Sequence, residues 1–238
     1  MKTWFQLLTV CLLLCLLTVP IHAECRGAFV FPKNEKDALE GVYFFGESTT
    51  AHLARAGGIL DAAENRDKVL RDESGTRYLD ARILSSPVFY GGEKIAFIEA
   101  VERAQPRILV LSFGLNGITR WSRNTDAFLR NYRALIDGVL SRSPNTKIIL
   151  QSVYPVGENE CFSSPVHTLN TQIATLNGHI ESLSKEYENV DYINTAALLT
   201  DVSGALSPNY DIGDGIHLTN EAYRIILHFL CQFISNAE

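Results

Sequence analysis

The chain has 238 residues, of which 46% are hydrophobic and 20% charged, and its formal net charge is −6. This composition is too apolar for a disordered protein and too rich in charge for a protein that crosses a membrane many times. No lysine-rich block is present, and the sequence therefore argues against nucleic acid as the main partner, because phosphate binding needs clustered positive charge.

The first 23 residues have the pattern of a secretory signal peptide. Lys2 precedes an uncharged apolar stretch from Trp4 to Val19, and Ala23 is the small residue after which we place the cleavage site. The stretch is shorter than the roughly 20 apolar residues of a membrane-spanning helix, so a retained anchor is the lesser alternative. We expect residues 24–238 to be secreted or extracytoplasmic, facing the cell envelope, with no stable membrane span.

Three cysteines remain once the signal peptide is removed. Cys25, Cys161 and Cys231 do not have the spacing of a metal site. In an oxidising compartment they can form one disulfide and leave one free thiol, and the sequence leaves all three pairings open.

Short apolar runs alternate with segments of helical periodicity along the mature chain. The predicted strands are bounded by polar or helix-breaking residues and cover residues 42–45, 108–111, 148–150 and 190–193. A weaker strand signal covers residues 68–71. The predicted helices cover residues 93–104, 128–140, 169–187 and 222–233. This alternation predicts right-handed crossovers and a parallel sheet covered on both faces, in one three-layer α/β domain of residues 24–238.

Ligands of such sheets bind beyond the carboxyl ends of the strands, so the residues that follow the strands are the candidates for chemistry. Ser48 follows the first strand in Gly46-Glu47-Ser48, where a backbone amide at a helix start can hold an oxyanion. A serine in this place is also a common helix cap, so this motif alone does not identify a nucleophile. Glu47 stands where a phosphate-binding loop needs lysine, which excludes that reading.

Two further polar clusters lie at comparable places. Asn116, after the strand at 108–111, can donate its side-chain amide to a developing negative oxygen, although Asn116-Gly117 is also an ordinary turn dipeptide. Asp214 and His217 lie three residues apart before the last helix. The carboxylate can accept from one imidazole nitrogen and leave the other to act as a base. Together with Ser48, these clusters supply a nucleophile, an oxyanion donor and a base.

These motifs resemble a known enzyme family. Gly46-Glu47-Ser48, Gly114-Leu115-Asn116 and Asp214-Gly215-Ile216-His217 are similar to the first, third and fifth blocks of the SGNH (GDSL) hydrolases. The resemblance covers essentially the mature chain and implies a flavodoxin-like α/β/α sandwich. It implies that Ser48 is the nucleophile, His217 the general base and Asp214 the partner that orients it. The Ser48 amide and the Asn116 side chain would then belong to the oxyanion hole.

The second block of the family supplies a further oxyanion donor, a glycine amide. Gly92 fits best, with Gly91 as the alternative, because the pair follows Tyr90 and precedes a predicted helix; Gly75 fits less well. The chain departs from the family pattern at Glu47 and Gly117, where the family usually has Asp, and loop geometry is expected to differ there.

Four residues near these motifs are candidates for contact with the substrate: Glu47, Arg120, Trp121 and Tyr154. Arg120 and Trp121 follow the predicted oxyanion turn, where they can stack a sugar ring or hold a polar head group, or equally begin the next helix. Tyr154 follows a strand at the same edge of the sheet.

The resemblance implies a serine esterase that works through an acyl-enzyme and needs no metal or other cofactor. We expect a small-molecule or glycan ester as the substrate, with a short acyl group such as O-acetyl, because the short chain leaves little room for a lipid-binding lid. The alternatives are an O-acyltransferase that uses the same residues and a catalytically silent carbohydrate-binding module. The sequence leaves the acyl group, the alcohol and the oligomeric state open.

Overall fold

A computed structural model describes residues 31–75, 77–160 and 162–237. The predicted signal peptide, the domain start at residue 24, and residues Cys25 and Cys161 lie outside the described residues. Cys231, the one cysteine within them, is a buried free thiol.

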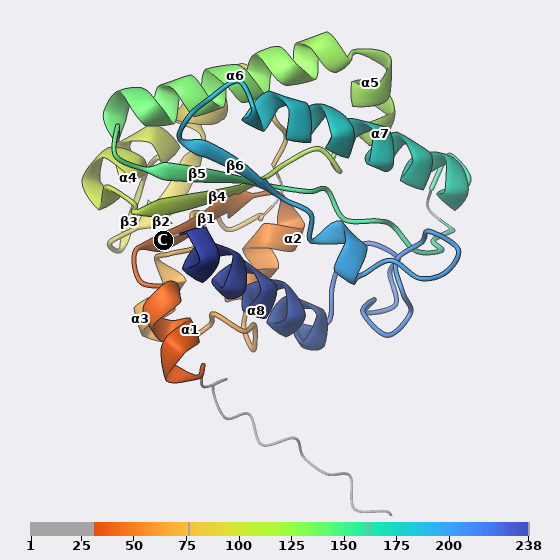
Figure 1. Cartoon of the computed structure of the whole chain (residues 1–238), viewed down its shortest axis with the longest axis horizontal. Coiled ribbons are helices and arrows are strands. Elements are labelled where there is room, and N and C mark those ends of the chain that lie inside the picture. Colours follow the sequence, from red (N-terminus) through yellow and green to blue (C-terminus); the bar gives the residue numbers. More distant parts are fainter. Residues whose placement is uncertain (1–30, 76, 161, 238) are drawn as a thin grey trace, which may run out of the picture.

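Four parallel strands form the central sheet (Figure 1), in the order β1-β4-β5-β6. They are β1 (Val42–Gly46), β4 (Ile108–Ser112), β5 (Lys147–Gln151) and β6 (Val190–Ile193). All four confirm strands that the sequence predicts. Every residue of β4 is buried, as is typical of a strand with a covering layer on each face.

A short segment at residues 68–70 extends this sheet beyond β1. Val69 pairs with Phe44 in a parallel bridge, and the Leu70 amide donates to the Phe44 carbonyl at 2.8 Å. The weaker strand signal is thus confirmed as a bridge. It gives the sheet the order of a flavodoxin-like fold, with the second segment of the chain outside the first strand.

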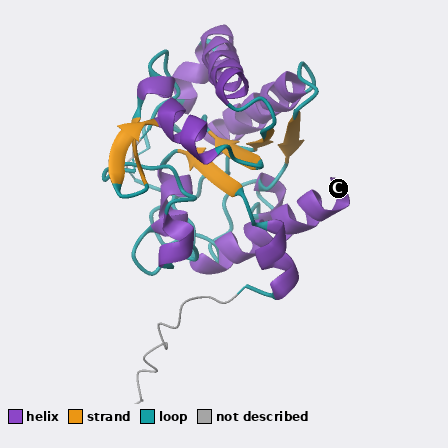
Figure 2. Cartoon of the chain, turned by 90° about the vertical axis from the view of Figure 1, so that its left-hand side faces the viewer, coloured by secondary structure: helices purple, strands orange, loops and turns teal. Residues whose placement is uncertain are grey.

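Helices cover the two faces of the sheet, which confirms the predicted three layers (Figures 1 and 2). Side chains alternate along the strands, so Leu109 and Leu111 of β4 belong to one hydrophobic cluster and Ile108 and Val110 to the other. The first cluster packs against α4 (Phe97–Ala104), α5 (Ile118–Arg123), α6 (Thr125–Arg142) and α7 (Val166–Ser184). The second packs against α8 (Asn220–Ala237) and the segment around α1 (Lys33–Ala38).

The remaining helices are short. They are α2 (Ser48–Ala51) and α3 (Ala63–Arg66), with the 3-10 helices η1 (His52–Ala54), η2 (Ile83–Ser85) and η3 (Ala196–Leu198). No helix in the described part of the chain is both long and apolar enough to cross a membrane.

The prediction of a helix over residues 93–104 is wrong for its first four residues. Those residues form β3 (Glu93–Ala96), which pairs in antiparallel fashion with β2 (Pro87–Tyr90). Gly91 and Gly92, with φ of 60° and 80°, make the two-residue turn between them. Such turns need positive φ at both central residues, which glycine adopts without strain. The Gly-Gly pair thus signals a hairpin rather than the approach to a helix.

Candidate active site

Ser48, Asn116, Asp214 and His217 lie at the carboxyl edge of the central sheet. Gly46, the last residue of β1, pairs with Ser112, the last residue of β4. Ser48 and Gly114 each follow these residues by two positions, so the turn that bears Ser48 and the turn at residues 114–116 leave the sheet side by side. The loop before α8 supplies Asp214 and His217 to the same edge.

Ser48, His217 and Asp214 form a continuous row of hydrogen bonds. Ser48 Oγ lies 3.0 Å from His217 Nε2, and His217 Nδ1 lies 2.6 Å from Asp214 Oδ2. A carboxylate beside Nδ1 keeps the proton on that nitrogen, so Nε2 is left as the acceptor for the serine hydroxyl. Such a row has the geometry needed for a serine hydroxyl to be deprotonated by an imidazole that a carboxylate orients.

The carboxyl group of Asp214 is held on both of its oxygens. Its Oδ1 accepts from the backbone amides of Ile216 at 2.9 Å and His217 at 2.7 Å, while Oδ2 faces the imidazole. Burial works against the charge, but these amides and the His217 ring outweigh it and keep the pKa of Asp214 below its usual value. The side chain therefore stays ionised and fixed in one orientation.

Asp211 orders the loop that carries His217, a role that the sequence analysis does not predict. Its Oδ1 accepts from the amides of Gly213, Asp214 and Gly215 at 2.8 to 3.1 Å. Gly215 has φ of 72°, and a Cβ at this position would lie 2.7 Å from the Glu158 carbonyl. Glycine is thus required there, and the Asp-rich, Gly-rich spacing was the available signal.

Glu47 is buried and organises the turn at residues 114–116 instead of facing a substrate. Its side chain accepts three backbone amides, from Gly114 to Oε1 and from Leu115 and Asn116 to Oε2, each at 3.0 Å. The residue is 3% exposed, so its assignment as a substrate contact is wrong. Burial raises the pKa of Glu47 to about 7, although the three amides act to lower it.

Asn116 lies in this turn, where its side-chain amide and its backbone carbonyl are both hydrogen-bonded. Its side-chain amide donates to the Arg77 carbonyl at 2.6 Å, which leaves one of its two N–H bonds for another acceptor. Its own carbonyl accepts from the indole Nε1 of Trp121 at 2.9 Å. Trp121 is 1% exposed and thus supports the turn from inside, so its assignment as a sugar-stacking residue is wrong.

The other two predicted substrate contacts differ in exposure. Tyr154 is buried and its hydroxyl accepts from the Gln151 side chain at 2.6 Å, so it cannot reach a substrate as predicted. Arg120 is exposed, with its guanidinium carbon 4.7 Å from the centre of the Trp121 ring. Of the four candidates, Arg120 alone keeps an accessible side chain.

Gly91 and Gly92 lie at the wrong edge of the sheet for an oxyanion hole. Their neighbour Tyr90 has its ring 6.4 Å from that of Tyr43, near the amino end of β1, whereas Ser48 follows the carboxyl end. The Gly91 amide donates to Asp67. The prediction for both glycines is therefore wrong.

Gly75, unlike Gly91 and Gly92, lies beside the turn that bears Ser48. A Cβ on Gly75 would lie 3.1 Å from the Cβ of Ala51, in the helix that Ser48 begins. Its amide donates to Asp72 Oδ1 at 2.9 Å, and Asp72 also pairs with the buried Arg77 at 3.2 Å. The sequence alone favoured Gly92 because the hairpin around it was not recognised.

Two other contacts near Ser48 are not among those predicted from the sequence. The ring of His52 stacks on that of His217, with centroids 4.2 Å apart and planes inclined by 25°. From α8, the Tyr223 hydroxyl donates to the Thr49 carbonyl at 2.6 Å. The spacing of His52 four residues after Ser48 was a usable signal, since such residues share one face of a helical turn.

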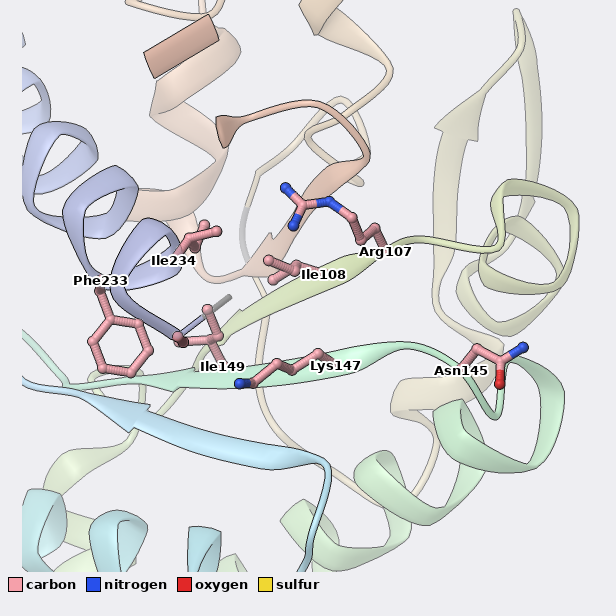
Figure 3. A pocket seen from close by; sticks show the side chains of 8 residues that line it. Arg107, Ile108, Asn145, Lys147, Ile149, Phe233 and Ile234 are labelled. Atoms are coloured by element: carbon pink, nitrogen blue, oxygen red, sulfur yellow. The ribbon is translucent and has the colours of Figure 1, made fainter. Parts of the chain in front are cut away.

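A cavity of about 210 Å³ lies away from these residues (Figure 3). Its walls are formed by Arg107, Asn145 and Lys147 near the amino ends of β4 and β5, with Phe233 and Ile234 of α8. It therefore opens at the other edge of the sheet. In the described part of the chain, no group of three or more His, Cys, Asp or Glu side chains is arranged to hold a metal ion.

Comparison with solved structures supports the fold. The chain is similar to a candidate platelet activating factor from Streptococcus pneumonia (TM-score 0.59, 21% identity, 85% of this chain and 91% of that chain covered). It is also similar to a GDSL-like lipase from Bacteroides thetaiotaomicron (0.56, 19%, 87% and 98%) and to an acetyl xylan esterase (0.56, 18%, 81% and 98%). Identities this low show a shared fold.

The sequence itself carries the family assignment. A search of curated protein sequences finds no match to the chain. Residues 44–225 match the GDSL-like Lipase/Acylhydrolase family, a span that includes Ser48, Asn116 and His217. The chain belongs to the GDSL-like lipase/acylhydrolase family, and it is an ester hydrolase.

Proposed function

We propose that the protein is a serine esterase in which Ser48 is the nucleophile, His217 the general base and Asp214 the residue that orients it. The observation that carries this proposal is the hydrogen-bonded row from Asp214 through His217 to Ser48, with distances of 2.6 and 3.0 Å. In this row the free nitrogen of the base already faces the hydroxyl that it must deprotonate.

The reaction follows from these positions. His217 Nε2 accepts the Ser48 proton while Oγ attacks the ester carbonyl, and the carbonyl oxygen becomes negative in the tetrahedral intermediate. Ser48 is the first residue of α2, so its amide has no acceptor within that helix and can donate to this oxygen. The second N–H of the Asn116 side chain is a further donor to the same oxygen. His217 then protonates the leaving alcohol, and water releases the acid from the acyl-enzyme.

We propose short acyl esters as substrates, with O-acetyl groups on carbohydrate first among them. The fold similarity to an acetyl xylan esterase supports this choice, as does the exposed guanidinium of Arg120 beside the oxyanion turn. The apolar stretch at residues 4–19 supports a secreted or envelope-facing location, where such glycans are found.

Hydrolysis of p-nitrophenyl acetate and labelling by a fluorophosphonate test the proposal. We expect turnover without any added acceptor, and a loss of at least about 10³-fold in kcat for S48A and H217A. The matched control is S182A, an exposed serine on α7, which should keep wild-type activity. Labelling that survives in S48A would contradict the assignment. Turnover only with a glycan acceptor would favour the acyltransferase, and glycan binding without turnover the silent module.

A further inference from the structure

The ring of His217 is held by more than its two hydrogen bonds. Its side chain is 22% exposed, so part of it faces solvent. A hydrogen bond at each nitrogen fixes the direction of the ring edges but leaves the faces to packing. Among the described aromatic rings, His52 stacks on one of these faces at 4.2 Å.

His52 and Ser48 come from one short segment of chain. Ser48 begins α2, and His52 follows its last residue as the first residue of η1. Four residues in a helical turn bring two side chains to the same face. The same turn therefore offers the hydroxyl to the edge of His217 and an imidazole to its face, so that one short segment contacts His217 twice.

Arg55 sets which ring nitrogen of His52 carries the proton. Its Nη1 lies 3.3 Å from His52 Nδ1, and a guanidinium can only donate, so Nδ1 is the acceptor and the ring proton sits on Nε2. Burial lowers the pKa of His52 to about 4, assisted by His217, Arg55 and Arg71 and opposed by Asp214. His52 is therefore neutral at the pH where a histidine base works, and adds no second positive charge beside His217.

We propose that His52 is a positioning residue for the general base: its neutral ring packs on His217 and keeps Nε2 in line with Ser48 Oγ. This inference rests on the proposed function. The proposal predicts that the reaction needs an aromatic ring at position 52 and not its nitrogen atoms. Packing between two ring faces does not depend on those atoms, and Nδ1 of His52 is already in contact with Arg55.

The test compares H52A, which removes the ring, with H52F, which keeps an aromatic ring and lacks both nitrogens. We expect H52A to lower kcat by about 10- to 100-fold with little change in KM, since a misplaced catalytic group costs rate more than binding. H52F should recover most of that loss. H179A, an exposed histidine on α7, is the matched control, and thermal unfolding of each variant reports whether it is folded.

A second readout does not depend on turnover. The proton between His217 and Asp214 lies in a short hydrogen bond and should give a low-field proton resonance while the ring is held still. We expect this resonance in wild type and H52F and its broadening in H52A. Loss confined to H52A supports the positioning role even if the proposed substrates are wrong. Unchanged kcat and resonance in H52A, or H52F as slow as H52A, would overturn it.

Discussion

Two carboxylates, Glu47 and Asp211, each accept three backbone amides from a loop at the carboxyl edge of the sheet. They differ in burial and in how far along the chain these amides lie. Asp211 binds amides two to four residues further along its own loop and is partly exposed. Glu47 is buried and reaches amides 67 to 69 residues away. The loop of His217 is thus organised locally, whereas the turn at residues 114–116 depends on a tertiary contact made beside Ser48.

Removing each carboxylate in turn should lower the free energy of unfolding by different amounts. E47A leaves three amides without an acceptor in a buried place, and we expect a loss of about 3 kcal/mol in the free energy of unfolding. D211A should cost about 1 kcal/mol, because water can replace the carboxylate in its partly exposed loop. Denaturant unfolding measures both, with E188A at an exposed site as the control. Equal losses would show that the two loops do not differ as described.

The pH dependence of stability should show the buried charge of Glu47. Its pKa is about 7 in the folded protein against an ordinary 4.5, so the folded state holds the proton more tightly between these values. The protonated Glu47 side chain therefore adds its full stabilisation to the folded state below about pH 4.5. This stabilisation, roughly 3 kcal/mol in total, is lost as the pH rises through 7.

The matched measurement is the difference in unfolding free energy between wild type and E47Q across pH 4 to 8. His52 has a lowered pKa of about 4, so its own effect is a gain in stability as the pH rises toward its ordinary value of 6.5. The difference cancels this contribution because both proteins contain His52. A difference that does not vary with pH would contradict the assignment of a raised pKa to Glu47.

The indole of Trp121 should have the smallest effect of these contacts. W121F removes the donor to the Asn116 carbonyl, and we expect kcat to fall by a few-fold and the unfolding free energy by about 1 kcal/mol. R120A is the matched neighbour, which keeps the indole in place. If R120A raises KM for an acetylated sugar while W121F does not, the two adjacent residues serve substrate and turn respectively.

The sequence predicts the parts of the site that depend on local contacts and not those that depend on contacts between distant residues. The strands, the long helices and the Asp214–His217 pair depend on short-range patterns, and the sequence predicted them. Trp121 and Tyr154 were placed on the surface because nothing local shows that their side chains turn into the core. The three amides that meet Glu47 could not be predicted either, since they depend on the register of β1 against β4.

The contact between Tyr223 and Thr49 ties the turn that bears Ser48 to the helix that follows His217. The ribosome adds His217 169 residues after Ser48, so a growing chain carries its serine hydroxyl for most of its synthesis without the imidazole that we propose as its base. On the proposed function, ester hydrolysis therefore requires that the loop of His217 has packed against the turn that bears Ser48.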